Sequence, residues 1–289
     1  MKQHNLKKRF VDAVVISDVH LGTYGCHAKE LLRYLKSIKT KKLILNGDII
    51  DMWQFSKRYF PGSHMKVLKY ILTMVTKKTK VYYITGNHDE MLRKFAGYKM
   101  GSLEIINKLV FEHDGKKTWI FHGDVFDVTM QHSKWLAKLG SIGYDILIVL
   151  NKLVNFISEK MGHGKLSFSK KIKNSVKKAV SYVNDFEQLT ADIAIANKYD
   201  HVICGHVHQP QKKLMRNNHG QVIYLNSGDW VENLTALELK DGEWSIYTYM
   251  EGGFPSFINN SDNETQISNN KELFNDLVVE LSNVLKIDK

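Results

Sequence analysis

The sequence predicts an α/β protein in which two packed β-sheets are flanked by helices, with a helical cap inserted in the second half of the chain. Short apolar runs that stop at polar residues or glycine alternate with amphipathic stretches over the first half. This alternation is typical of parallel strands joined by helices. Residues 125–191 interrupt the pattern, because they contain apolar and basic segments but no convincing strand. Strand-like runs then resume and continue to Tyr249.

Eight apolar runs are predicted to be strands and two amphipathic stretches are predicted to be helices. Short runs rich in β-branched and aromatic residues suit buried strands, whereas longer stretches with apolar residues on one side suit helices. Asp241-Gly242, between the last two runs, predicts a hairpin turn. The predicted strands are 13–17, 42–46, 81–85, 118–121, 201–205, 222–226, 234–239 and 244–249, and the predicted helices are 28–36 and 64–77.

We expect three parts: a core formed by residues 1–124 and 192–255, an inserted cap at 125–191, and a tail at 256–289. The cap carries ten lysines against five acidic residues, a net charge of +5, and its helical segments are more apolar than a surface helix requires. It therefore either packs on the core with its lysines solvated, or opens toward an anionic, acyl-bearing ligand. The tail reads as a polar linker followed by a short amphipathic helix.

The composition of the chain limits the classes of protein to which it can belong. A chain of 289 residues with 43% hydrophobic content can bury a large core. Its two cysteines are too few for a disulfide framework, so we expect a reducing, cytoplasmic compartment. No run reaches the roughly 20 apolar residues of a membrane span. The formal net charge of +11 indicates an anionic partner, whether nucleic acid, phospholipid or a diphosphate substrate.

Metal-binding residue types follow five of the predicted strands. Carboxylates, imidazoles and an amide oxygen suit Mn, Fe or Zn where water must become a nucleophile. Ligands gather at the carboxyl ends of strands in an open α/β sheet, so we expect these side chains to converge. The alternation of side chains along a strand also predicts that each D-x-H or H-x-H pair shares one side. The candidates are Asp18, His20, Asp48, Asn87, His122, His206 and His208.

In order, the motifs read D-x-H, GDxxD, GNHD, H and GHxH, which resembles the calcineurin-like metallophosphoesterase superfamily from about Ala13 to about Tyr249. The resemblance implies a sandwich of two mixed β-sheets flanked by helices. It also implies two divalent metal ions, with Mn favoured and Fe or Zn open, that would clamp a phosphate and activate water. By the same resemblance, one metal is held by Asp18, His20 and His208, the other by Asn87, His122 and His206, and Asp48 bridges the two.

His88 and Asp51 are the predicted catalytic residues. By the resemblance, His88 is not a metal ligand but lies beside the leaving group, where an imidazole can protonate the departing oxygen. Asp51 is the natural partner that orients it, because a carboxylate on one ring nitrogen fixes the tautomer and favours the protonated ring.

Within the superfamily, the chain resembles the group related to the UDP-2,3-diacylglucosamine pyrophosphatase of lipid A biosynthesis. The resemblance rests on the DVHLG start, Trp53 after the second block, His122-Gly123-Asp124 before the cap, and the segment 226–232. It implies hydrolysis of the pyrophosphate bond to UMP and the acylated sugar 1-phosphate, at the inner face of the membrane. From their positions after the His122 block and in the cap, the predicted substrate contacts are Asp127, Asn174, Lys177 and Lys178.

His88 departs from that group, whose well-known members have arginine after the asparagine of the third block. Arginine suits a bidentate clamp on a diphosphate, whereas histidine suits proton transfer. Two alternatives therefore stay open: a phosphodiesterase or phosphatase acting on nucleotides or nucleic acid, and a non-enzymatic interaction module on the same fold. The expected partners are a phosphorylated, acylated small molecule and the inner membrane surface, with no obligate protein partner evident.

Overall fold

In the computed structural model, residues 8–53, 59–126 and 169–250 are described, with the backbone alone over 169–180. The first layer is a seven-stranded mixed sheet with strand order β12-β11-β1-β2-β3-β5-β4. Its parallel centre is followed on each edge by antiparallel strands. The strands are β1 (Arg9–Ile16), β2 (Ile38–Asn46), β3 (Lys80–Ile84), β4 (Lys99–Met100), β5 (Leu103–Ile106), β11 (Thr235–Lys240) and β12 (Glu243–Thr248).

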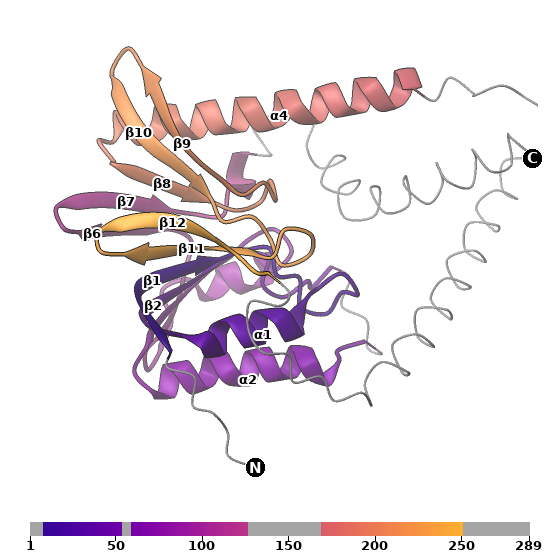
Figure 1. Cartoon of the computed structure of the whole chain (residues 1–289), viewed down its shortest axis with the longest axis vertical. Coiled ribbons are helices and arrows are strands. Elements are labelled where there is room, and N and C mark those ends of the chain that lie inside the picture. The colour runs from indigo at the N-terminus through magenta and orange to yellow at the C-terminus, as the bar shows by residue number, and fades with distance from the viewer. Residues whose placement is uncertain (1–7, 54–58, 127–168, 251–289) are drawn as a thin grey trace, which may run out of the picture. The chain divides into compact units, whose positions relative to one another are not determined.

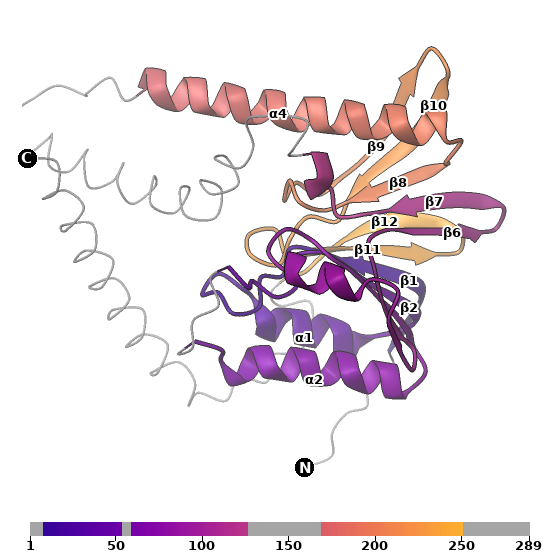
Figure 2. The same cartoon turned by 180° about the vertical axis from the view of Figure 1, so that it is seen from behind.

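The second layer is a five-stranded sheet with strand order β6-β7-β8-β10-β9, in which β7, β8 and β10 run parallel. Figures 1 and 2 show it packed on the larger sheet, with α4 along its outer face and α1 and α2 beneath the larger sheet. The strands are β6 (Leu109–His113), β7 (Lys116–Ile120), β8 (His201–Cys204), β9 (Gln211–Asn217) and β10 (Gly220–Asn226). The helices are α1 (Ala28–Ser37), α2 (Gly62–Thr76) and α4 (Ser169–Ala196), with short 3-10 turns η1 (Glu90–Phe95) and η2 (Asp124–Phe126).

Three apolar clusters hold these layers together. Along β1, Val14 and Ile16 belong to the cluster shared with α1 and α2, while Ala13 and Val15 belong to the cluster between the two sheets. A strand that is buried on both faces in this way needs apolar residues at successive positions. A third cluster joins α4 to the smaller sheet through residues such as Phe186. The core therefore fixes the ends of the central strands, where the candidate ligands begin.

The predicted fold class is confirmed, since the protein contains two mixed β-sheets flanked by helices. Asp241 and Gly242 both have positive φ angles, as a type I′ hairpin turn requires. The prediction missed β4, β5, β6 and β9. In β9 the side chains alternate between exposed and half-buried, and five of its seven residues have charged or amide side chains, so its apolar signal was weak.

Helix α4 is longer than expected, because it continues without a break through the predicted boundary at 191/192 to Ala196. Its last turns bury Ala191, Ala194 and Ile195 against the smaller sheet. The division into core and cap stays a prediction, since residues 127–168 and the tail from 251 lie outside the described residues. Among the residues searched, no helix is long and apolar enough to cross a membrane.

Candidate metal centre

The candidate ligands lie in loops that follow the carboxyl ends of five strands. Asp18 comes two residues after β1, Asp48 two residues after β2, and His122 two residues after β7. Main-chain hydrogen bonds join these loops: Asp18 N donates to Gly47 O at 3.1 Å, and Gly205 N donates to His122 O at 3.0 Å. The convergence that parallel strand ends predict is therefore observed.

The backbone at these ligands differs from the expectation. Asp18 and His20 were expected to share one side of a strand, yet β1 ends at Ile16 and both residues have positive φ angles of 51° and 52°. Of the ten non-glycine residues with positive φ in the described part of the chain, five are candidate ligands: Asp18, His20, Asp48, His206 and His208. Such conformations cost of order 1 kcal/mol or more each and cluster at functional sites. Strained loops, rather than strand alternation, bring the pairs together.

Asp18, His20 and His208 form one cluster whose potential ligand atoms all lie within 4.8 Å of one another. Asp18 Oδ1 is 3.1 Å from His208 Nε2. The Nδ1 atom of His20 is hydrogen-bonded to Asp51 Oδ2 at 3.0 Å. A carboxylate on Nδ1 leaves Nε2 as the atom that can bind a metal. These are the three residues that the resemblance assigned to one metal.

Asp48, His122 and His206 form a second cluster within the same 4.8 Å limit. His122 Nδ1 is 2.8 Å from the carbonyl oxygen of Asn46, and its Nε2 is 3.3 Å from Asp48 Oδ2. The backbone carbonyl therefore orients the ring so that Nε2 faces the cluster. The backbone N–H of His88 donates to Asp48 Oδ1 at 2.8 Å. Asp48 thus joins the second and third motif blocks.

Several buried atoms in these clusters lack a hydrogen-bond partner within the described residues. They include two of the proposed ligand atoms, His20 Nε2 and Asn87 Oδ1. Two more, Asp18 Oδ1 and His122 Nε2, are satisfied only by the ion-pair contacts with His208 and Asp48 given above. A buried polar atom without a partner costs about 1 to 3 kcal/mol, so such a group of them needs an explanation. Divalent cations supply one, because all four are oxygen or imidazole donors of the kind that Mn, Fe and Zn accept. The residues present therefore fit a metal centre.

Charges in the clusters shift the pKa values in opposite directions. Burial raises the pKa of Asp18, but His208 opposes burial and lowers that pKa to about 2. Burial lowers the pKa of His208, yet Asp18 and Asp229 raise it to about 9. Likewise, Asp48 outweighs the burial of His122 and holds its pKa well above the usual value. In the protein without metal, protonated imidazoles therefore face ionised carboxylates.

Two glycines allow the loops to approach the ligands. A Cβ atom on Gly205 would lie 2.6 Å from Asp18 Oδ2, and one on Gly86 would clash with Asp48 Oδ1 and lie 2.7 Å from Asp48 N. Contacts this short do not occur at real Cβ atoms. Both positions therefore need glycine for space.

His88 lies at the edge of the first cluster, between two rings. Its centroid is 4.3 Å from that of Trp53 and 4.6 Å from that of His20. His88 Nδ1 is 2.9 Å from Asp51 Oδ2, the same oxygen that is hydrogen-bonded to His20. Asp51 was expected to orient His88. In the structure it contacts both imidazoles, so it positions a candidate ligand and a candidate catalytic residue together.

The sequence analysis did not identify Asp89 and Asp229 as positioning residues. Asp89 accepts hydrogen bonds from Ile49 N at 2.9 Å, Tyr83 OH at 2.6 Å and Gly86 N at 2.6 Å. Asp229 accepts hydrogen bonds from three backbone N–H groups that follow it, and its Oδ2 is 4.0 Å from His208 Nδ1. Both residues lie in motif segments, GNHD and 226–232, but nothing local distinguished a loop-ordering carboxylate from a ligand.

The predicted substrate contacts are not placed by the structure. Asp127 lies outside the described residues, and Asn174, Lys177 and Lys178 lie where only the backbone of α4 is described. A small pocket of about 290 Å³ does lie beside His122, lined in part by Trp119, Phe121 and Val125. Arg93 and Asp124 form an ion pair at its edge. The described residues thus offer a partly apolar hollow next to the clusters.

Comparison with known proteins places this geometry in a family. The model of the calcineurin-like phosphoesterase family matches residues 12–210. The chain is 26% identical over 235 residues to the UDP-2,3-diacylglucosamine hydrolase of Blochmanniella pennsylvanica, covering 78% of this chain and 91% of that protein. It is 24% identical over 246 residues to the protein of the same name from Aliivibrio fischeri, covering 80% and 96%.

Among solved structures, the chain is similar to the phosphoesterase Yfce from E. coli, at 12% identity and a TM-score of 0.40, covering 82% of this chain and 99% of that one. At this score the likeness adds nothing to the family match. The match spans most of the chain and includes every candidate ligand. The protein belongs to the calcineurin-like phosphoesterase family and is a metal-dependent phosphoester hydrolase.

Proposed function

We propose that the protein hydrolyses the pyrophosphate bond of UDP-2,3-diacylglucosamine, or of a similar lipid-linked substrate, to UMP and the acylated sugar 1-phosphate. The observation that carries this proposal is the pair of His/Asp clusters at the strand ends, in a chain whose UDP-2,3-diacylglucosamine hydrolase relatives match it over most of its length.

Two metal ions, with Mn²⁺ proposed and Fe or Zn as alternatives, would be held by the two clusters. Asp18, His20 and His208 form the first set, and His122, His206 and Asn87 form the second, with Asp48 between them. Bound there, divalent ions would supply positive charge for the phosphate oxygens and would lower the pKa of water. The chain itself orients the donors, because Asp51 and the Asn46 carbonyl hold Nδ1 of His20 and His122.

His88 would donate a proton or a hydrogen bond to the leaving phosphate. Its ring lies between Trp53 and His20, and Asp51 contacts Nδ1, which favours the charged ring, the form that carries a second proton on Nε2. The proposal gives His88 a role of its own, since the related pyrophosphatases carry arginine at this position. A histidine there suits a leaving group that needs protonation.

The acyl chains and the sugar would be bound by the cap, which also brings the protein to the inner face of the cell membrane. Asp127, Asn174, Lys177 and Lys178 are the proposed contacts. Support comes from the basic charge of this segment, and from the relatives named UDP-2,3-diacylglucosamine hydrolase, whose name specifies a diacylated nucleotide sugar. Cytoplasmic location on that membrane is part of the same proposal.

A second candidate is a phosphodiesterase or phosphatase acting on nucleotides or nucleic acid. Two observations favour it: the histidine at position 88 and the formal net charge of +11. Neither requires acyl chains. The two candidates predict different substrates for the same metal centre, so turnover separates them.

The test is a substrate panel with Mn²⁺ present: UDP-2,3-diacylglucosamine, the same nucleotide sugar without acyl chains, a cyclic nucleotide, single-stranded DNA and an aryl phosphodiester. We expect the diacylated substrate to have the highest kcat/KM and to give UMP. Lys177→Ala/Lys178→Ala should raise KM for this substrate and spare the aryl phosphodiester. Faster cleavage of the cyclic nucleotide or DNA, with acyl chains making no difference, would establish the second candidate instead.

A further inference from the structure

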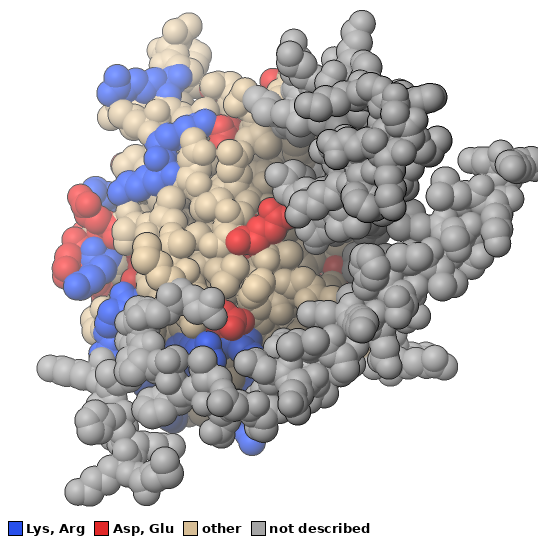
Figure 3. All heavy atoms as spheres, turned by 45° about the vertical axis from the view of Figure 1, so that its right-hand side comes forward, with Lys and Arg blue, Asp and Glu red and all other residues tan. Residues whose placement is uncertain are grey.

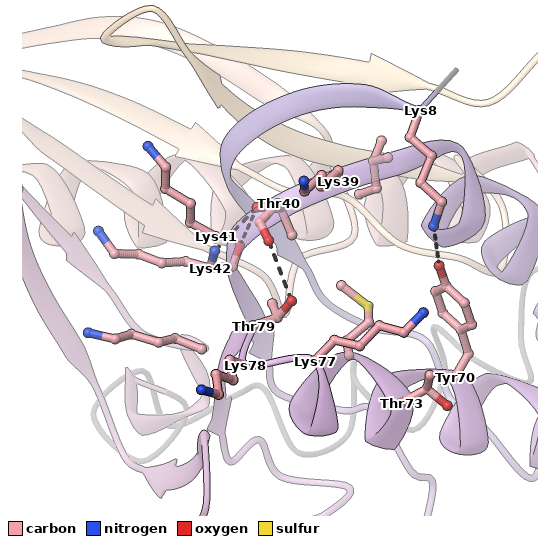
Figure 4. Close-up of a pocket in the computed structure, with 13 residues that line it drawn as sticks. Lys8, Lys39, Thr40, Lys41, Lys42, Tyr70, Thr73, Lys77, Lys78 and Thr79 are labelled. Carbon is pink, nitrogen blue, oxygen red and sulfur yellow. Dashed lines mark hydrogen bonds between the residues drawn. The ribbon is translucent and has the colours of Figure 1, made fainter. Parts of the chain in front are cut away.

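A basic pocket lies at the amino ends of β2 and β3. Its volume is about 660 Å³, and it is bounded by the start of β2, the end of α2 and the start of β3 (Figure 4). Pockets of this size hold small molecules in other proteins. Asp48 and Asn87 follow the opposite, carboxyl ends of the same two strands. The length of the sheet therefore separates this pocket from the metal centre.

Among the described residues, seven lysines line the pocket, and no aspartate or glutamate does. They come from three separate segments of the chain, so local sequence alone does not account for their meeting. Figure 3 shows Lys and Arg side chains gathered along one side of the described surface, together with some acidic residues. The pocket lysines are Lys39, Lys41 and Lys42 on β2, Lys77 and Lys78 after α2, Lys80 on β3, and Lys8 before β1.

Ordinary structural roles occupy only some of these lysines. Lys41 has a carboxylate partner, Asp12 at 3.0 Å, and Lys8 donates to Tyr70 OH at 2.9 Å. No ion pair to a described residue is recorded for the other five. In Figure 4, Lys77 extends across the pocket toward Lys8 and Tyr70. Lys8 and Lys77 therefore bring two ammonium groups to the same side of the pocket (Figure 4), and no carboxylate of a described residue is among the residues that line it. Lys41 and Lys42 extend toward the other side (Figure 4), where Lys42 Nζ lies 4.7 Å from the centroid of the Phe111 ring.

The end of α2 does not need the lysines either. Backbone N–H groups already satisfy its last carbonyls, since Lys77 N donates to Thr73 O at 3.1 Å, Lys78 N to Val75 O at 3.0 Å and Thr79 N to Met74 O at 3.0 Å. Lysine side chains near a helix end often serve that purpose. Here backbone donors already fill that role, so the side chains of Lys77 and Lys78 are available to meet a ligand.

Grouping these charges has an electrostatic cost. Burial lowers the pKa of Lys42, and the neighbouring Lys80 and Lys41 lower it further. Like charges that are close together repel one another, and an anion placed among them removes the repulsion. An ammonium on a flexible stem binds phosphate oxygens as a point charge, without the fixed geometry of a guanidinium. The lining therefore matches a ligand with several negative charges.

We propose that this pocket is a second, non-catalytic site that binds a ligand carrying two or more phosphate groups, either a free polyphosphorylated molecule or the head groups of anionic phospholipids. The site is independent of the substrate proposed for the metal centre, because it lies at the other end of β2 and β3. By this proposal, part of the positive charge of the chain serves to bind a ligand at a place outside the cap.

Calorimetric titration with inorganic tripolyphosphate tests the proposal, using the full chain with Asp48→Ala as a parent that does not turn over. The pocket variant is Lys39→Ala/Lys77→Ala. The control is Lys66→Ala/Lys69→Ala, which removes the same charge from exposed positions of α2 outside the pocket. We expect the pocket variant to weaken binding about tenfold or more and the control to change it little. Binding should also weaken as salt is raised.

A second arm identifies the source of the phosphate groups, by co-sedimentation with phosphatidylglycerol vesicles and with phosphatidylcholine vesicles. Loss of phosphatidylglycerol binding in the pocket variant alone assigns the site to lipid head groups, whereas tripolyphosphate binding without vesicle binding assigns it to a free ligand. The proposal is overturned if both variants lose binding equally, or if only single-stranded DNA binds. Thermal unfolding checks that each variant is folded, and aryl phosphodiester turnover is measured on the same lysine replacements made with Asp48 intact. Lys77→Ala alone serves as a milder replacement.

Discussion

The carboxyl ends and the amino ends of β2 and β3 differ in how tightly their side chains are held. At their carboxyl ends, the chain buries unpartnered donor atoms and holds five candidate ligands in left-handed backbone conformations. At their amino ends, lysines extend from β2, from β3 and from the segment that follows α2, and most of them are exposed to solvent. Strain and burial are concentrated where side chains must be held at fixed distances. Long, flexible lysine side chains need neither backbone strain nor burial, because the attraction between charges does not require a fixed geometry.

The largest expected effect is at the carboxyl end, from Asp48→Ala. Asp48 lies in the second cluster and accepts the backbone hydrogen bond of His88, so its removal should abolish turnover and lower the metal content. Metal analysis and turnover measure both effects. Asp12→Ala is the matched control, because Asp12 pairs with Lys41 at the amino end. Two metals per chain and full turnover in Asp48→Ala would refute the bridging role.

His88→Ala should reduce turnover by about 10² to 10⁴ while the protein keeps its metal, since general acid–base help is of that size. Asn87→Ala, at the neighbouring position, should instead lower metal content, because its buried Oδ1 has no other partner in the described residues. Metal analysis on both variants separates a catalytic residue from a ligand. If His88→Ala is the variant that loses metal, His88 is a ligand.

Gly86→Ala tests how closely the loops must approach. The added Cβ would displace Asp48, and a shift of about 1 Å at such a site costs roughly a hundredfold in turnover. Gly62→Ala, at the start of α2, is the control, because its Cβ would meet nothing within 4 Å. Equal activity in the two variants would show that the loops can relax around Asp48.

Metal affinity should rise with pH. The pKa of His208 is raised to about 9, and that of His122 is also raised, so both rings are protonated at neutral pH in the metal-free protein. A metal must displace those protons, which makes affinity increase about tenfold per pH unit for each proton released, up to the raised pKa values. Chelator competition at several pH values measures it. An affinity independent of pH would mean that the rings are neutral before metal binds.

The smallest effect is expected at the amino end. Lys39→Ala/Lys77→Ala removes repulsion among the pocket lysines, so the melting temperature should rise by about 1 °C at low salt, and the difference should vanish at high salt. Differential scanning fluorimetry over a salt series measures this. A fall in melting temperature at every salt concentration would show that these lysines stabilise the fold through contacts.

The sequence predicted only part of the fold and part of the candidate site. Central strands were recognised because residues such as Val14 and Val15 are buried on both faces and therefore apolar in succession. Edge strands such as β9 were missed, since solvent on one side permits charged residues. Asp89 and Asp229 were missed as positioning residues because their partners, such as Tyr83 OH and the Asn233 N–H, are identified only by contact in space.

The sequence by itself determined the ligand chemistry, because each ligand type is encoded locally, in order, beside the glycines that make room for it. The tertiary structure alone decided how those ligands meet. Asp18 and His208 approach to 3.1 Å through positive-φ loops that no strand periodicity predicts. The tertiary structure also decided where the lysines gather, since those of the pocket come from three segments of the chain. Distances between residues remote in sequence depend on packing, which local patterns do not contain.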